Sequence, residues 1–388
     1  MSLYDFTEFL KLSSVLNYNL SAASLNRYNV LLFIIGGKKL DPDDQIDREY
    51  KSIVMEALSY LFSAYSQKRR RLGPLAVLHP LRAAALFTRS GDNLNLVALL
   101  TTLFHDILED ITSTDYNVQQ WKEMESQLCG LFERLHPDDE TALVQRLHSV
   151  TRLDTETYYQ YIARLLESAD PAPEIVQIKL ADRLDNTLDM RIELEDPLSD
   201  IDFFQDIFQL LFVNNYSGYH PRLEHPPTTA LNGARRLYQL FKNAVLLSMI
   251  RQTVDISGDR AARSLFEALS DASLLEAQRT LIHLLEYHCS DLTAQRSLLL
   301  EAMQYCYSGR TDLVTEADTK WMLDGLFSSY FGETSKQTRN LQLDRLYHDK
   351  PLMIQASIAF IVIFLSFLND DTYYVKGISA SGVSPNQT

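Results

Sequence analysis

The chain has 388 residues, of which 46% are hydrophobic and 22% charged, and its formal net charge at pH 7 is −15. This composition is that of an ordinary globular protein with a sizeable core, and the length suits about two domains of ~150 residues each. The acidic balance argues against a nucleic-acid partner, which requires a basic surface. It is compatible with a small anionic substrate held in one locally basic or metal-containing pocket.

The three cysteines, Cys129, Cys289 and Cys306, are odd in number and widely spaced. They are typical of reduced thiols rather than of a disulfide framework. The opening residues, MSLYDFTEFLKL, lack a basic stretch followed by an apolar one, so no signal peptide is expected. Together these features predict a cytoplasmic protein.

Apolar side chains recur with a period near 3.6 along almost the whole chain, and Gly and Pro are scarce, which predicts an all-α fold. Residues 1–45 are expected to form an N-terminal extension of two or three short helices. The next helix is predicted over Glu49–Arg71, because its four terminal basic residues and the following Gly73–Pro74 suit a helix C-terminus.

A second helix is predicted to begin near His79–Pro80. A third should begin at Asn93 or Asn95, both good N-cap residues, and continue without a break through LFHDILEDI at 103–111. Two or three more helices are expected over 115–168.

A further helix is predicted over Glu174–Leu194. A hinge is expected between Pro197 and Pro227, where SGYHPRLEHPPTT concentrates turn-forming residues. About six more helices should follow from Thr229 to Leu368. The chain is thus divided into an extension, two helical domains and a disordered tail, at 1–45, 46–200, 201–375 and 376–388.

The segment Leu352–Leu368 is strongly apolar, but it is shorter than the ~20 residues that a membrane-spanning helix needs. It also contains Gln355, Ser357 and Ser366. We therefore favour a buried core helix over a membrane anchor for this segment.

The stretch LFHDILEDI places four ionisable residues, His105, Asp106, Glu109 and Asp110, in an apolar run. Such groups are costly to bury unless they are paired or bound to a metal. His105 and Glu109 are four residues apart, as are Asp106 and Asp110, so on one α-helix all four would share a sector. The pattern fits either the solvated face of a surface helix or four members of a metal site.

Two other polar residues, His79 and Asp182, also lie in apolar surroundings, and Asn186 follows Asp182 by four positions. Each has an ordinary structural explanation, as a helix-terminal residue or a member of an ion pair. Taken with His105 and Asp106, however, they supply two imidazoles and two carboxylates. This mixed nitrogen and oxygen set suits Mn²⁺, Fe²⁺ or Zn²⁺ better than calcium.

The order HP…HDxxED…KLADRxxN resembles the HD-domain metal-dependent phosphohydrolases. Within them it is most similar to the hydrolase domain of the RelA/SpoT alarmone enzymes and to the small alarmone hydrolases. The resemblance covers about 50–195, less than half of the chain, and implies an HD-domain helical bundle over 46–200 with an additional helical C-terminal region. It is carried by four stretches, at 70–86, 98–111, 150–153 and 177–191.

The resemblance also implies roles for individual residues. One metal ion, Mn²⁺ first and Fe²⁺ or Zn²⁺ as alternatives, would be bound by His79, His105, Asp106 and Asp182. Two carboxylates would position and activate the attacking water, Glu109 and Asp110. Substrate contacts would come from Arg70, Arg71 and Asn186.

The implied activity is hydrolysis of guanosine 3′-diphosphate alarmones (ppGpp and pppGpp) with release of pyrophosphate. We find no synthetase motif in 200–388. The family's SGEPYIxHP is LGPLAVLHP here, and Asp185 stands where the family commonly has His or Tyr. These departures leave two alternatives open: a phosphohydrolase acting on another nucleotide or phosphate ester, and a nucleotide-sensing regulatory module. The expected partner is a small anionic nucleotide, and a homo-oligomer is compatible with the sequence.

Overall fold

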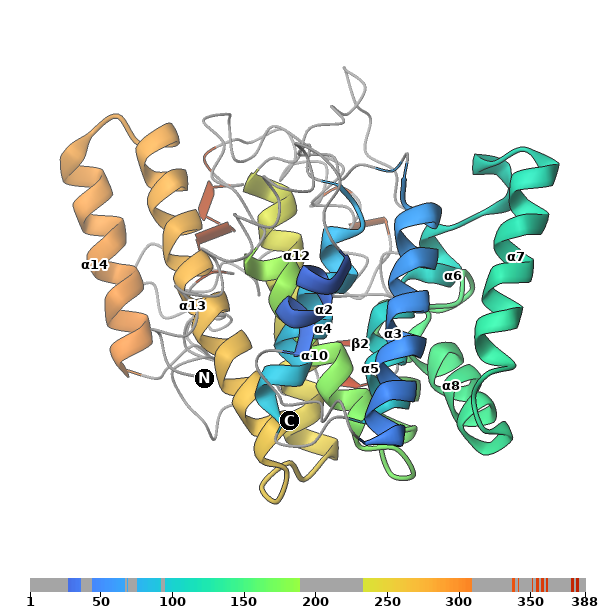
Figure 1. The fold of residues 1–388 in the computed structure, drawn as a ribbon. Helices are drawn as coiled ribbons and strands as arrows, with labels where there is room; N and C mark the ends of the chain where they lie inside the picture. Colours follow the sequence, from blue (N-terminus) through green and yellow to red (C-terminus); the bar gives the residue numbers. More distant parts are fainter. Residues whose placement is uncertain are drawn as a thin grey trace. The chain divides into compact units, whose positions relative to one another are not determined.

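The computed structural model describes most of the N-terminal half of the chain, one long block after it and a few short stretches near the end. The described residues are 27–35, 44–66, 68, 75–91, 95–188, 233–308, 337–338, 341, 351, 354–355, 357–358, 361, 378–379 and 382–383. They are mostly helical, so the predicted all-α class is confirmed (Figure 1). Several predictions fall outside them: Arg70 and Arg71, the hinge at 197–227, and most of the extension, the apolar segment 352–368 and the tail.

The chain divides into two compact units. Unit 1 comprises residues 1–155, 164–188 and 254–269, and unit 2 comprises 156–163, 189–253 and 270–388. The helices of unit 1 are α2 (Arg27–Ile35), α3 (Gln45–Ala64), α4 (Leu78–Ser90), α5 (Leu96–Phe104), α6 (Ile107–Asp110), α7 (Val118–Phe132), α8 (Pro137–Val150) and α10 (Glu174–Leu188), with a 3₁₀ turn η1 (Ser113–Asp115). Helix α9 (Tyr158–Glu167) and helix α13 (Arg260–His288) each have residues in both units.

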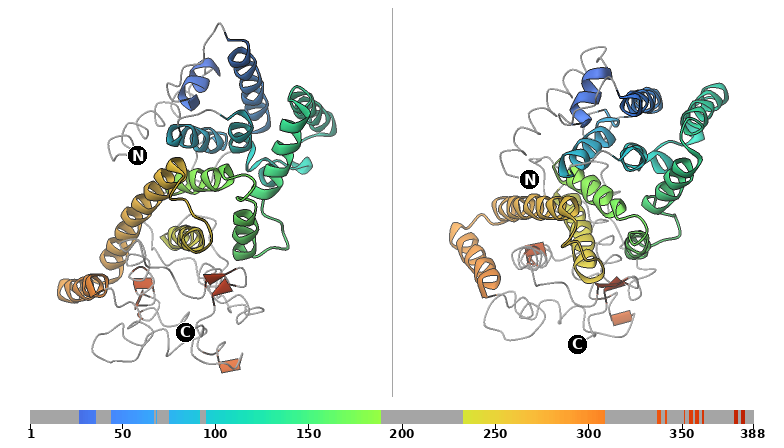
Figure 2. Two further views of the ribbon diagram at one scale, coloured as in Figure 1. Left: turned by 90° about the horizontal axis from the view of Figure 1, so that it is seen from below. Right: turned by 60° about the horizontal axis from the view of Figure 1, so that its bottom comes forward.

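Two helices form the centre of unit 1. Every residue of α4 from Leu78 to Thr88 is buried, and so is every residue of α5. Helix α4 contacts α2, α5 and α10, and α5 also contacts α8 and α3 (Figure 2). The small residues Ala83, Ala84 and Ala85 permit close approach to α4. A polar side chain on either helix is therefore carried into the interior.

Local sequence signals account for the ends of several helices. The side chain of Asp44 caps α3 by accepting from the backbone N–H of Ile46, and Asn95 caps α5 by accepting from Ala98. The start of α10 at Glu174 confirms the prediction. The predicted helix to Arg71 is wrong at its C-terminus, since α3 ends at Ala64 and the chain turns there. A cluster of basic residues favours a helix end but does not specify its position.

Unit 2 contains α12 (Gly233–Thr253), the second part of α13 and α14 (Leu292–Ser308). Buried polar pairs join α12 to α13: Asn243 donates to Ser273 over 2.9 Å, and Arg236 forms an ion pair with Glu276. Two short strands, β1 (Ile378–Ser379) and β2 (Gly382–Val383), pair antiparallel with Ile378 opposite Val383.

No helix among the described residues is long and apolar enough to cross a membrane. In the segment 352–368, five side chains are described: Gln355 is partly exposed, and Ile354, Ser357, Ile358 and Ile361 are buried. Cys129 and Cys289 are both free thiols.

Candidate metal centre

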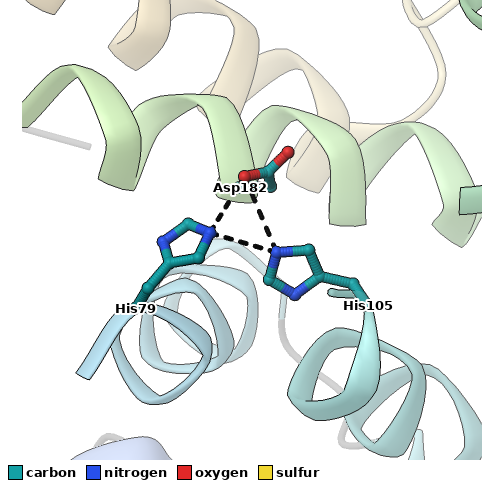
Figure 3. A group of neighbouring side chains, drawn as sticks. All are labelled: His79, His105 and Asp182. Carbon is teal, nitrogen blue, oxygen red and sulfur yellow. Dashed lines mark hydrogen bonds and ion pairs between the residues drawn. The ribbon is translucent and has the colours of Figure 1, made fainter. Parts of the chain in front are cut away.

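Three helical segments of unit 1 bring His79, His105 and Asp182 together. His79 is the second residue of α4, His105 directly follows α5, and Asp182 lies in the middle of α10. All three are buried, with exposed fractions of 3%, 3% and 4%. Figure 3 shows the two imidazole rings and the carboxylate pointing toward one common point. Because α4, α5 and α10 pack together as the core of the unit, the site is an integral part of that core.

The nitrogen and oxygen atoms of this group are close together. The Nε2 atoms of His79 and His105 are 3.1 Å apart. Asp182 Oδ1 lies 3.2 Å from the first and 3.6 Å from the second. An ion with ligand bonds of about 2.0–2.2 Å has adjacent ligand atoms about 2.8–3.6 Å apart. The three residues therefore have the spacing of metal ligands.

Asp106 completes the predicted set of four. Its Oδ2 lies 3.2 Å from His79 Nε2, and its Oδ1 lies 3.2 Å from His105 Nε2. The side chain of Asp106 is 27% exposed, whereas those of His79 and Asp182 are 4% and 5% exposed. Asp106 is therefore the member of the group that solvent reaches most readily.

Hydrogen bonds orient both imidazole rings. His79 Nδ1 lies 2.7 Å from Asp185 Oδ2, and His105 Nδ1 lies 2.8 Å from the carbonyl oxygen of Thr102. Both partners are acceptors, so each Nδ1 donates its N–H, and in the neutral ring the Nε2 lone pair then points into the site. Two such lone pairs at 3.1 Å repel one another unless a cation lies between them. The arrangement fits a bound metal ion.

The same preference for positive charge shows in the protonation of the metal-free group. Burial disfavours a charged imidazole, yet the carboxylates of Asp106 and Asp182 raise the pKa of His105 well above its usual value. Burial also disfavours charged carboxylates, but His105 and His79 lower the pKa of Asp106. Lys179, followed by the two imidazoles, lowers the pKa of Asp182. Without a metal ion, a proton on His105 thus supplies the positive charge that a bound cation would supply.

The backbone at the HDxxED motif differs from the prediction of one continuous helix. Helix α5 ends at Phe104, His105 and Asp106 form a turn, and α6 begins at Ile107. Neighbouring residues of an α-helix project about 100° apart, since there are 3.6 per turn. The break allows both His105 and Asp106 to face the same point, as their 3.2 Å contact requires. The shared sector expected from one helix is therefore not the arrangement found.

Two residues that contact the site were not predicted as site residues: Arg82, and Asp185, which the sequence showed only as a departure from the family pattern. Asp185 accepts two hydrogen bonds from Arg82, at 2.6 and 3.0 Å, in addition to that from His79. Arg82 is three residues after His79, and Asp185 is three residues after Asp182. Each pair thus lies on one helix face, which is the signal that could have identified them. Although burial opposes it, Arg82 and then His79 lower the pKa of Asp185 to about 2.

Asp182 has two further polar partners on its own helix. Lys179 donates from Nζ to Oδ2 over 2.7 Å, and Asn186 donates from Nδ2 to Oδ1 over 2.6 Å. Asn186 is thus brought to the site, while its role in binding a sugar stays a prediction. Lys179 was not foreseen, and it supplies a cation next to the site.

Glu109 and Asp110 lie at the exposed end of the motif, after the turn. Glu109 Oε1 accepts from the backbone N–H of Arg152 over 2.8 Å, and Asp110 Oδ2 accepts from the hydroxyl of Tyr65 over 3.0 Å. Partial desolvation and the nearby charge of Asp106 raise the pKa of both carboxyls, although these two hydrogen bonds oppose the shift. Lys68 bonds to the backbone oxygen of Asp110. Raised pKa values are suited to proton transfer.

Comparison of the chain with known protein families, with curated proteins and with solved structures gave no match.

Proposed function

We propose that unit 1 binds one divalent transition-metal ion and hydrolyses a phosphate ester or anhydride bond of a small nucleotide. The observation that carries the proposal is the convergence of four side chains, those of His79, His105, Asp106 and Asp182. The two Nε2 atoms are 3.1 Å apart, and each carboxylate has oxygen atoms 3.2–3.6 Å from both of them. A mixed set of two imidazoles and two carboxylates favours Mn²⁺, Fe²⁺ or Zn²⁺ over Ca²⁺ and Mg²⁺. Mn²⁺ remains our first choice, on the strength of the resemblance alone.

The bound ion would act as a Lewis acid and lower the pKa of a coordinated water. The chain supplies the groups that handle protons. Glu109 presents a carboxylate whose Oε1 is held by the N–H of Arg152, which leaves Oε2 to accept a proton from the attacking water. Its raised pKa makes it a stronger base than an ordinary glutamate. Asp110 is held by Tyr65 beside it and would orient the same water.

The charges around the site suit an anionic substrate despite the net charge of −15. Lys179 contacts Asp182, and Lys68 contacts Asp110 and Asp115. Either ammonium group can neutralise a phosphate oxygen. Asp106, on the open side, faces the direction from which such a substrate would arrive.

Within this reaction class we propose a guanosine 3′-diphosphate alarmone as substrate, with pyrophosphate as product. The support is the order of motifs in the sequence, in which the metal ligands and both water-handling carboxylates match the alarmone hydrolases. Contacts from Arg70, Arg71 and Asn186 to the nucleotide belong to the same proposal. The changed stretch before His79 favours a second candidate, a different nucleotide or phosphate ester, for the same chemistry.

The experiment is a turnover assay with the purified full chain and Mn²⁺. The panel holds guanosine 5′-diphosphate 3′-diphosphate, a 3′-phosphorylated nucleotide and a nucleoside monophosphate, and the readout separates pyrophosphate from phosphate. We expect pyrophosphate from the first compound, lost in Asp106→Ala and Glu109→Gln and retained in Glu123→Gln, a change at an exposed residue of α7. Release of phosphate alone would select the second candidate. Tight nucleotide binding without any turnover would instead indicate a sensing module.

A further inference from the structure

Asp185 occupies an unusual place for an acidic residue. It is 1% exposed and lies on α10 one turn after Asp182, with no ligand atom in the metal group itself. Its Oδ2 contacts His79 Nδ1 at 2.7 Å, and both of its oxygens accept hydrogen bonds from Arg82. His79 and Arg82 are buried as well, at 3% and 6% exposure. Three ionisable side chains are thus buried in one chain of contacts that ends at the metal group.

We propose that Asp185 is the positioning residue of the metal centre and that Arg82 is its anchor. In this proposal, which rests on the proposed metal site, Asp185 fixes the ring of His79 with the proton on Nδ1 and the lone pair of Nε2 toward the ion. An ionised carboxylate at that position also makes the imidazole a stronger donor.

Arg82 explains how Asp185 can perform this task. Its guanidinium donates from Nε to Oδ1 and from a terminal nitrogen to Oδ2, a two-pronged contact that fixes the plane of the carboxylate. With that plane fixed, Oδ2 lies in one position, and the direction of the Nδ1–H bond sets the orientation of the His79 ring. The pair also supplies the positive charge that a carboxylate requires in a buried site.

A purely structural ion pair accounts less well for this arrangement. Burying an ion pair is seldom stabilising compared with an apolar pair of the same size, because desolvation offsets the attraction. An Arg82–Asp185 pair that served stability alone would not need the additional contact between Asp185 and His79 Nδ1. The other ring nitrogen of His79 lies 3.2 Å from Asp182, so this contact links the pair to the metal group. Asp185 stands where the alarmone hydrolases that the sequence resembles commonly have His or Tyr, so the proposed contact departs from that pattern.

The test measures metal binding rather than activity, with Co²⁺ as the probe. Two variants remove the carboxylate: Asp185→Asn, and the double variant Asp185→Asn with Arg82→Met. The double variant removes both charges, so it leaves no uncompensated guanidinium in the core. If the single variant does not fold, the test relies on the double variant. Both should bind Co²⁺ about 10- to 100-fold more weakly and change its visible absorption bands, which report the geometry around the ion.

The matched control is Glu174→Gln. Glu174 is on the same helix and pairs with Arg146 at 3.4 Å, but it contacts none of the metal group. We expect wild-type Co²⁺ affinity and spectrum for this variant, with helicity checked by circular dichroism for all. If the double variant matches the wild type in both readouts, or if Glu174→Gln weakens binding equally, the positioning role is overturned. Asp182→Ala distinguishes the two proposals, because wild-type binding by that variant would overturn the metal site itself.

Discussion

The Nε2 atoms of His79 and His105 face one another at 3.1 Å in the interior of unit 1. Each ring donates its other N–H to a protein acceptor, so neither can turn away without losing a buried hydrogen bond. Two buried lone pairs held this close need a positive charge between them. Metal binding should therefore be both stabilising and dependent on pH.

Metal should stabilise the folded protein. At a free Mn²⁺ or Co²⁺ concentration of about 100 times Kd, binding adds roughly 2.7 kcal/mol to the free energy of unfolding. For a unit of about 200 residues, this raises Tm by about 5–10 °C. Differential scanning calorimetry with metal and with EDTA measures the difference. Asp182→Ala should show none, and an equal shift in that variant would contradict binding at this site.

The stabilisation of the folded protein by metal should increase with pH. The raised pKa of His105 means that, without metal, its proton stabilises the fold below about pH 6.5, and this contribution is lost as pH rises through the raised value. A metal ion must displace that proton, so its affinity rises with pH. The difference in Tm between metal-loaded and metal-free protein should therefore widen from pH 5.5 to pH 8. Calorimetric titration in two buffers should detect the released proton, and a difference that narrows instead would count against this account.

Glu109→Gln should separate catalysis from metal binding. The carboxylate of Glu109 is not among the four ligands, so the variant should bind Mn²⁺ and melt like the wild type. Its turnover should fall by about 10²–10⁴-fold, the usual range for loss of a general base. Parallel measurement of kcat and metal affinity is the check. Equal loss of both would mean that Glu109 is a ligand rather than a base.

Two leucines on either side of the turn offer a matched test of the fold. Leu103 is 1% exposed and Leu108 is 50% exposed. Leu103→Ala should lower the free energy of unfolding by about 2–5 kcal/mol. Leu108→Ala should change it by no more than about 0.5 kcal/mol. Urea denaturation measures both. Similar losses would mean that Leu108 is buried like Leu103, contrary to its exposed position in the structure.

The sequence predicted which residues gather at the candidate metal centre. The 3.6-residue period identified a helical protein, because apolar periodicity is a local property that any segment displays by itself. His79, His105, Asp106 and Asp182 were selected because ionisable residues in apolar helices need a partner, and the structure brings all four together. Arg70 and Arg71 lie outside the described residues, so their roles remain predictions.

The positions of helix ends were harder to predict. The turn at His105 and Asp106 interrupts an apolar run that, taken alone, favours one helix. The free energy that stabilises this break comes from contacts with His79 and Asp182. These residues are distant in the sequence, so local helix propensity does not include them.

By itself, then, the sequence determined the helical class and the residue types that could hold an ion. Only the tertiary structure decided which partners orient them. Arg82 and Asp185 are 103 positions apart, and either would be an ordinary charged residue on a helix if α4 and α10 did not pack together. The two residues pair because the packed helices exclude water, and a buried charge is stable only beside an opposite charge. His79 lies between this ion pair and the metal group.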